Sequence, residues 1–331
     1  MAGMMLRRAL YMIPTIFLIS IVAFLIIALP PGDYLTTLVA QMKAQGYTVD
    51  PGELAGLKQR YGLGSPIYVQ YWKWISAIVL HLDFGESFQL NRPVSSLVAA
   101  RLPLTIVLTS VSVIFTWIVA FPIAVYSAVR QYSAGDYLFT TLGFLGLAVP
   151  NFLIALVFLY IGYRYFHQSV GGLFSPDYID ASWNLGKVID LLAHIWVPVI
   201  VLGTAGTAGL IRVLRANLLD ELRKPYVVAA RARGVPERRL ILKYPLRVAI
   251  NPFISTIGWL LPTLISGEVI VAQVLSLPTT GPMMLSALLS QDMYLAGSII
   301  LIISVLTVIG TLLSDLALMW LDPRVRLGRG G

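Results

Sequence analysis

Six stretches of the chain are continuously apolar and long enough to cross a membrane as helices. A helix needs about 20 apolar residues to span a hydrocarbon core. The stretches lack the alternation of apolar and polar residues that strands of a membrane β-barrel require. The pattern therefore predicts an all-α integral membrane protein with six transmembrane helices, near residues 10–29, 104–129, 137–163, 191–214, 253–275 and 294–321.

The polar connections divide the chain into four segments. Residues 1–29 are expected to hold a cytoplasmic N-terminus and a first span that is too long for a cleaved signal. Residues 30–101 are expected to form an extracytoplasmic subdomain, because bare loops rarely exceed about 15 residues. Residues 102–321 hold the other five spans and a long loop at 220–250, and residues 322–331 form a cytoplasmic tail.

One part of the large outer connection has helical spacing. Ile67, Tyr71, Trp74 and Ile78 recur at intervals of three and four residues, which predicts a helix. Aromatic residues collect at membrane interfaces, so this helix fits an interfacial position, and a surface that contacts substrate is the alternative.

The orientation follows from the distribution of positive charge. With the N-terminus inside, sixteen of the twenty-four Lys and Arg residues fall in cytoplasmic connections, where such residues are enriched. Both termini are therefore expected in the cytoplasm. Anionic lipid and topology account for the basic loops, so we expect the bilayer as a partner and no nucleic acid.

The most basic connection lies between Arg212 and Arg247, with ten Lys or Arg residues and three acids. Pro225 suits the first position of a helix, and Gly234 stands where a left-handed cap would end it. Four side chains recur at helical spacing between them, and Pro236 with Glu237 restarts a second helix. The sequence predicts a short surface helix that presents Tyr226, Ala229, Ala230 and Arg233 to another protein.

These residues resemble a known family. The order Ala229, Ala230, Gly234 and Leu246 is similar to the EAA loop of permease subunits of ABC importers. Further stretches, RRALYMIPTIFLISIVAFLIIALPPGD, PIYVQYWKWISAIVLHLDFGESF and DLALMWLDPRVR, resemble the B-type permease subunit of oligopeptide and dipeptide importers. The resemblance extends over nearly the whole chain.

The resemblance implies the type I permease fold of ABC importers, in a prokaryotic inner membrane. The chain would form half of a pore for peptides or similar small solutes, together with a second, homologous permease. It further implies two cytoplasmic ATPase subunits, an extracytoplasmic binding protein, and an ATPase-coupling surface made by Tyr226, Ala229, Ala230, Arg233, Gly234 and Glu237.

The chain departs from the family pattern at several positions. Val228 stands where the EAA name implies Glu, and Arg247 replaces the last Pro of the motif. Ala272 takes the place of an acidic residue, and the turn that follows reads Pro-Thr-Thr-Gly at 278–281. These two changes near the outer end of the fifth span bear on which solute is carried, and they leave the coupling role unaffected.

Two features inside the spans suggest roles. Glu268 is a carboxylate within an apolar run, which costs at least about 2.5 kcal/mol in lipid, so it fits either the translocation path or a structural hydrogen bond. The fourth span contains Gly203, Gly206 and Gly209. Such small residues let helices approach closely, which predicts helix packing here.

Two other classes of protein also consist of membrane-spanning helices: intramembrane proteases, and stand-alone transporters or channels. An intramembrane protease would need a motif such as H-E-x-x-H or G-x-S-x-G, and neither occurs. A stand-alone secondary transporter or channel stays open as the alternative. No G-x-x-x-x-G-K-[ST] loop occurs, so ATP would be bound by partner subunits and this chain would carry no cofactor.

Overall fold

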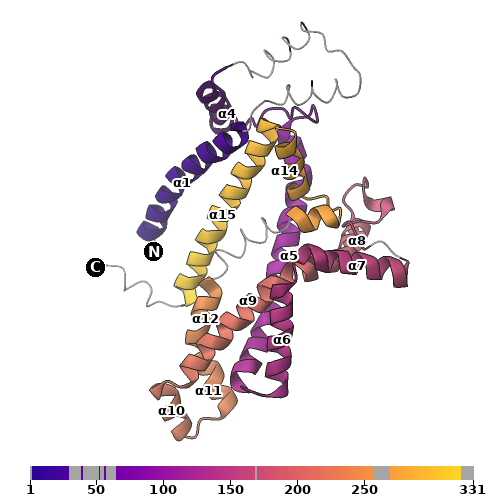
Figure 1. The fold of residues 1–331 in the computed structure, drawn as a ribbon. Helices are drawn as coiled ribbons and strands as arrows, with labels where there is room; N and C mark the ends of the chain where they lie inside the picture. Colours follow the sequence, from indigo (N-terminus) through magenta and orange to yellow (C-terminus); the bar gives the residue numbers. More distant parts are fainter. Residues whose placement is uncertain are drawn as a thin grey trace. The chain divides into compact units, whose positions relative to one another are not determined.

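The computed structural model describes residues 2–29, 39, 52, 56, 65–167, 170–255 and 269–321. In this part of the chain the backbone forms helices and loops, with one isolated antiparallel bridge between Glu86 and Pro93. The all-helical expectation is therefore confirmed for the described residues. The named helices (Figure 1) are α1 (Ala2–Ala28), α4 (Ile67–His81), α5 (Val94–Val129), α6 (Ala134–Ala148), α7 (Asn151–Phe166), the 3₁₀ helix η1 (Pro176–Tyr178), α8 (Leu185–His194), α9 (Trp196–Leu222), α10 (Pro225–Ala232), α11 (Glu237–Lys243), α12 (Pro245–Ser255), α14 (Thr280–Leu289) and α15 (Met293–Leu321).

Four described helices are long and apolar enough to cross a membrane. They lie in α1, α5, α9 and α15, and the pair α6 and α7 makes a fifth if it counts as one span. Most of the span predicted at 253–275 falls at 256–268, outside the described residues. The structure thus supports a multi-pass membrane protein with four to five candidate spans among the residues it describes.

The third predicted span, residues 137–163, is not one straight helix. It breaks between α6 and α7, whose axes differ by 100°. The cause is Pro150, which disfavours the helical conformation of the residue before it. Val149 is accordingly extended, with φ −89° and ψ 123°, and Pro150 is the N-cap residue of α7.

Helix α5 is longer than expected. It has 36 residues, which corresponds to about 54 Å at 1.5 Å per residue, well beyond a hydrocarbon core of about 30 Å. Its first turns, from Val94 onward, lie in the segment assigned to the outer subdomain. That connection is therefore partly a continuation of a spanning helix.

The chain divides into two compact units, and the first contains residues 1–105 and 279–308. Its core packs α4 against α1 and the first half of α15. Trp74 and Phe24 are each 1% exposed and their rings lie 5.7 Å apart. The helix expected from the spacing of Ile67 to Ile78 is present, but Trp74 faces this core rather than a membrane interface.

A buried carboxylate holds the outer loops of the first unit together. Asp292 is fully buried and precedes the first residue of α15. It accepts hydrogen bonds from the Ser87 hydroxyl at 2.5 Å and from the amides of Gln89 and Leu295 at 3.0 and 3.1 Å. One side chain therefore caps α15 and ties it to the loop that follows α4.

The second unit, residues 106–278 and 309–331, is built around α9. Helices α6, α7 and α12 all pack along α9. Gly203 is where α9 approaches α5, because an added Cβ would lie 2.6 Å from the Phe115 ring. The space beside Gly209 is open. Close helix packing within the described part of this chain is therefore seen at Gly203 and is absent at Gly209.

We expect Asp292→Ala to destabilise the first unit. The substitution removes the α15 cap, which contributes about 1 kcal/mol, and leaves the buried Ser87 hydroxyl without its acceptor, which costs about 1 to 3 kcal/mol more. Thermal denaturation of the purified protein in detergent measures the effect. Asp180→Ala, at an exposed carboxylate, is the matched control, and equal melting temperatures for the two variants would contradict this role.

Candidate functional site

The candidate site is the basic loop, defined as residues 220–250. In the second unit, α10 and α11 lie at the end of α9 where α12 begins (Figure 1). Helix α9 continues to Leu222, and only Arg223 and Lys224 separate it from α10. Pro225 occupies the first turn of α10, as expected from the sequence. A connection of two residues thus joins a candidate spanning helix to the loop.

The turn between α10 and α11 is built on Gly234. Its φ is +76°, a left-handed conformation that glycine adopts without the penalty of a Cβ atom. The Val235 amide donates to Ala230 O at 3.4 Å and the Gly234 amide to Arg231 O at 3.0 Å. This pair of bonds is the Schellman motif of helix ends. The left-handed cap expected at Gly234 is confirmed.

The loop has its own small hydrophobic core. Val227 and Leu240 are fully buried, and Ala230 and Ile241 are each 8% exposed. Val235 packs against the same cluster from the turn. Helices of seven or eight residues are marginal alone, so this core accounts for the stability of the pair.

Ala230 belongs to this core and does not face a partner. The sequence predicted that Ala230 faces a partner together with Tyr226 and Ala229, but its side chain packs inside the loop. The reason is tertiary: the face of α10 that contains Val227 and Ala230 is covered by α11. A bulky side chain at Ala230 would therefore disrupt the loop itself before it met a partner.

The outer face of α10 presents small and apolar groups beside positive charge. Tyr226 is 41% exposed and Val228 is 53% exposed. Ala229, Ala232 and Arg233 are also exposed. We call Tyr226, Val228, Ala229, Ala232 and Arg233 the α10 ridge. Four members belong to α10, whose opposite face is buried, and Arg233 is its C-cap residue.

Polar contacts fix the two ends of α10. The Tyr226 hydroxyl donates to the Glu221 carboxylate at the end of α9, and desolvation together with this carboxylate raises the pKa of Tyr226 to about 12. Arg231 binds Glu237 through two hydrogen bonds of 2.6 and 3.1 Å. The Arg231 guanidinium holds the pKa of Glu237 below its usual value. Glu237 therefore joins α11 to α10, and the pair weakens only in acid, as pH falls through that lowered pKa.

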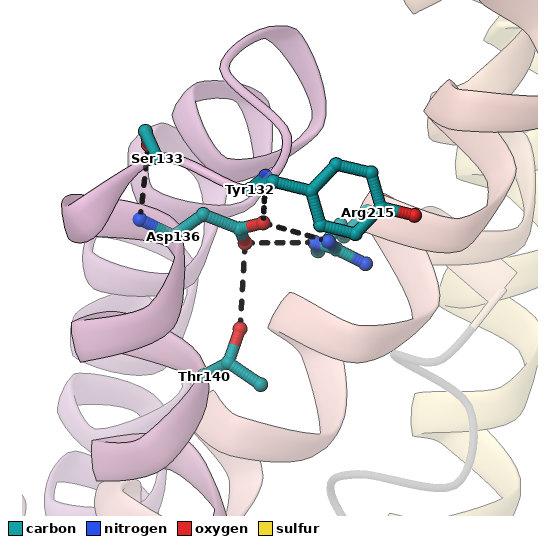
Figure 2. A network of polar contacts seen from close by, with 5 residues as sticks. All are labelled: Tyr132, Ser133, Asp136, Thr140 and Arg215. Carbon is teal, nitrogen blue, oxygen red and sulfur yellow. Dashed lines mark hydrogen bonds and ion pairs between the residues drawn. The ribbon is translucent and has the colours of Figure 1, made fainter.

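An ion pair braces α9 close to the loop (Figure 2). Arg215 donates from Nε to one Asp136 oxygen at 3.0 Å and from Nη2 to the other at 2.8 Å. The Asp136 carboxylate also accepts from the Tyr132 amide at 3.0 Å and the Thr140 hydroxyl at 3.4 Å. Its side chain is 4% exposed. The start of α6 is thereby joined to α9 two turns before α9 ends.

Sequence reasoning missed Asp136, and counted Arg215 only as one of ten basic residues. A signal was present, because Ser133 and Asp136 follow the S-x-x-D pattern of a helix start. The Ser133 side chain accepts from the Asp136 amide at 3.2 Å. The pattern indicates the cap of α6, but the partner of Asp136 lies 79 residues away.

Glu268 lies outside the described residues. Among the described residues no group of three or more His, Cys, Asp or Glu side chains could hold a metal ion. Gly206, the other predicted packing glycine, lies on α9 between Gly203 and Gly209 and is partly exposed.

The ion pair gives a testable energetic prediction. Arg215→Gln should lower the melting temperature of the purified protein, because removing one partner of a buried pair costs about 3 to 5 kcal/mol. The double variant Asp136→Leu with Arg215→Met removes both charges and should lose less than the sum of Asp136→Leu and Arg215→Met. Strictly additive losses would show that the two side chains do not interact.

The helices and the loop define a multi-pass helical membrane protein. Residues 120–327 match the family described as binding-protein-dependent transport system inner membrane component, and residues 1–109 match its N-terminal counterpart. The oligopeptide transport system permease protein AppB of Bacillus subtilis is 36% identical over 98% of this chain and 99% of that protein. A peptide permease protein of Brucella ovis is 31% identical over 97% and 98%. The nickel import system permease protein NikB of Staphylococcus aureus is 28% identical over 98% and 92%.

The chain belongs to the family of binding-protein-dependent transport system inner membrane components. It is a permease subunit of an ABC importer. The expectation of this family from the sequence is confirmed, and nothing in the comparisons favours a stand-alone carrier.

Proposed function

We propose that this subunit forms half of the translocation pathway of an importer for peptides or similar small solutes. The other half would come from a second, homologous permease, with two cytoplasmic ATPase subunits and an extracytoplasmic binding protein. The full-length similarity to an oligopeptide permease supports peptides first. Because the chain is also similar to a nickel permease, the proposal includes small solutes other than peptides.

The observation that carries the coupling role is the α10 ridge. Its Val228 and Ala229 side chains are apolar and exposed on a helix that the loop's own core already holds in place. A preformed helix with an exposed apolar ridge fits into a groove of another protein. Small residues at the ridge let the two backbones approach closely, and Arg233 can pair with acidic groups at the rim.

The same structure provides a way to transmit motion. The loop is fixed to α9 by the Tyr226 to Glu221 hydrogen bond, and α9 is fixed to α6 by the Asp136 to Arg215 pair. Displacement of a docked α10 would therefore carry α9 and α6 with it. ATP binding and hydrolysis on partner subunits would in this way rock the spans between inward-open and outward-open states.

The docking proposal predicts the effect of a bulky residue on the ridge. Ala229→Trp should leave the permease pair assembled but abolish copurification of the ATPase subunits and ATP-dependent uptake, because the added ring clashes at the dock. Ala193→Trp, at an exposed residue of α8, is the matched control. Normal ATPase copurification and uptake by Ala229→Trp would contradict the docking role.

The turn gives a second test of the same proposal. Gly234→Val should also lose ATPase association, because a β-branched residue pays about 1 kcal/mol or more for φ +76° or else redirects the chain. Gly234→Asn should retain most of the association, since Asn tolerates this conformation. Equal behaviour of the two variants would show that the direction of the turn does not matter.

We also propose six spans with both termini in the cytoplasm, supported by the excess of Lys and Arg in the connections assigned to that side. Reporter fusions after Gly234 and Gly330 should report a cytoplasmic location, and fusions near Gly46 and Gly172 an external one. An external signal at Gly234 would overturn both the topology and the ATPase dock. Within this topology, Glu268 is proposed to face the translocation path.

A further inference from the structure

A groove opens between α6 and α9, on the opposite side of the Asp136 brace from the basic loop. It has a volume of about 160 Å³. Its α6 wall contains Phe139, Gly143, Phe144 and Leu147, and its α9 wall contains Ala208 and Ile211. Gly143 and Ala208 form the floor of the groove, where α6 and α9 approach each other closely. A Cβ on Gly143 would lie 3.7 Å from the Cβ of Ala208. Apart from Thr140, whose hydroxyl donates to Asp136, and two arginines, the lining is apolar.

Two arginines of α9 also line the groove, and they differ in their contacts. Arg215 is committed to Asp136 through its bidentate pair. Arg212 lies one turn earlier on α9, is exposed, and has no hydrogen bond or ion pair in the part of the chain that the structure describes. The groove therefore includes a guanidinium whose five donors are available.

This arrangement places a cation close to the predicted end of a membrane span. Arg212 lies near the end of the predicted fourth span, at 191–214, on the side of the basic loop. A guanidinium is costly inside hydrocarbon and is stabilised by an anion at the interface. With the proposed orientation, that interface is the cytoplasmic leaflet, whose anionic lipids attract Lys and Arg.

We propose that the groove is a binding site for an anionic glycerophospholipid of the cytoplasmic leaflet. An acyl chain lies along the apolar walls of α6 and α9, and the headgroup phosphate accepts hydrogen bonds from Arg212. Arg is well suited to a phosphate because its planar fork donates two parallel bonds.

Charge favours a lipid over a protein helix in this groove, because Arg212 lines it. An acyl chain is thinner and needs no hydrogen-bond partner. A lipid also supplies a negative charge at the position of Arg212, which a transmembrane helix of a partner supplies only with an acidic residue at that depth.

The test uses the assembled importer in detergent, with phosphatidylglycerol and phosphatidylcholine of the same acyl chains added separately. Native mass spectrometry counts bound lipid, and the melting temperature reports its effect. Two variants alter the groove: Arg212→Gln removes the phosphate donor, and Ala216→Trp fills the mouth at an exposed groove residue. Arg130→Gln is the control, because it removes a basic residue from the same side of the membrane and does not line the groove.

The wild-type complex should retain phosphatidylglycerol in preference to phosphatidylcholine and be stabilised by it. Arg212→Gln should weaken that preference about fivefold, the effect expected for one basic residue near an anionic surface. Ala216→Trp should reduce retention of both lipids, and Arg130→Gln should behave as the wild type. Equal retention by the wild type and Arg212→Gln would overturn the proposal.

A partner helix over the groove is the competing outcome. Because the chain has no Cys, a Phe144→Cys variant offers one thiol in the groove wall for maleimide labelling. A lipid occupant predicts that delipidation restores labelling in the intact complex and that added phosphatidylglycerol suppresses it again. Protection that survives delipidation and is lost only when the second permease dissociates would assign the groove to a protein contact and overturn the lipid site. Docking on α10 is measured separately, by ATPase copurification. Failure of the lipid proposal can therefore be told apart from failure of the docking proposal.

Discussion

The bidentate pair between Asp136 and Arg215 is the interaction on which the arrangement of the second unit most depends. It joins the capped start of α6 to α9 at a nearly fully buried carboxylate. The same carboxylate accepts the Tyr132 amide, so it also holds the turn that precedes α6. A buried pair stabilises little overall compared with apolar packing, but losing one partner is costly. Its physical role is therefore to specify one position of α9.

The basic loop, which begins at the end of α9, is also held by contacts between its own elements. Its two helices are too short to persist alone, so Val227, Ala230, Leu240 and Ile241 form a core that holds them. Burying one face of α10 leaves the opposite face exposed, with Val228 and Ala229 on it. Exposed apolar side chains on a fixed helix are suited to a partner that can cover them. The packing that folds the loop thus also creates the exposed face that is proposed to dock.

The sequence predicted those structural features that depend on the conformational preferences of neighbouring residues. The helix start at Pro225 and the left-handed turn at Gly234 depend on the backbone preferences of single residues, and both were predicted. The family motif at Ala229, Ala230 and Gly234, together with the matching stretches along nearly the whole chain, identified the class of protein. The break at Val149 follows from Pro150, although the apolar run around it suggested one continuous span.

Features that depend on distant partners could not be read from the sequence. Val227 and Val228 are equivalent by composition, and only the position of α11 decides that one is buried and the other exposed. The same contact turns Ala230 inward. Asp136 and Arg215 lie 79 residues apart, so no local pattern could pair them. The outer-loop role of Asp292 has the same origin, because Ser87 lies 205 residues before it.

Helix α10 is proposed to be a preformed docking helix with one buried and one exposed face. Thiol reactivity tests it most directly, because single cysteines can be introduced into a chain that has none. In the permease pair alone, Ala229→Cys should react with maleimide quickly and Ala230→Cys slowly. Adding the ATPase subunits should protect Ala229→Cys, while Leu185→Cys, 77% exposed in the native side chain, should stay reactive. Fast labelling of Ala229→Cys in a complex with stoichiometric ATPase subunits would contradict the account.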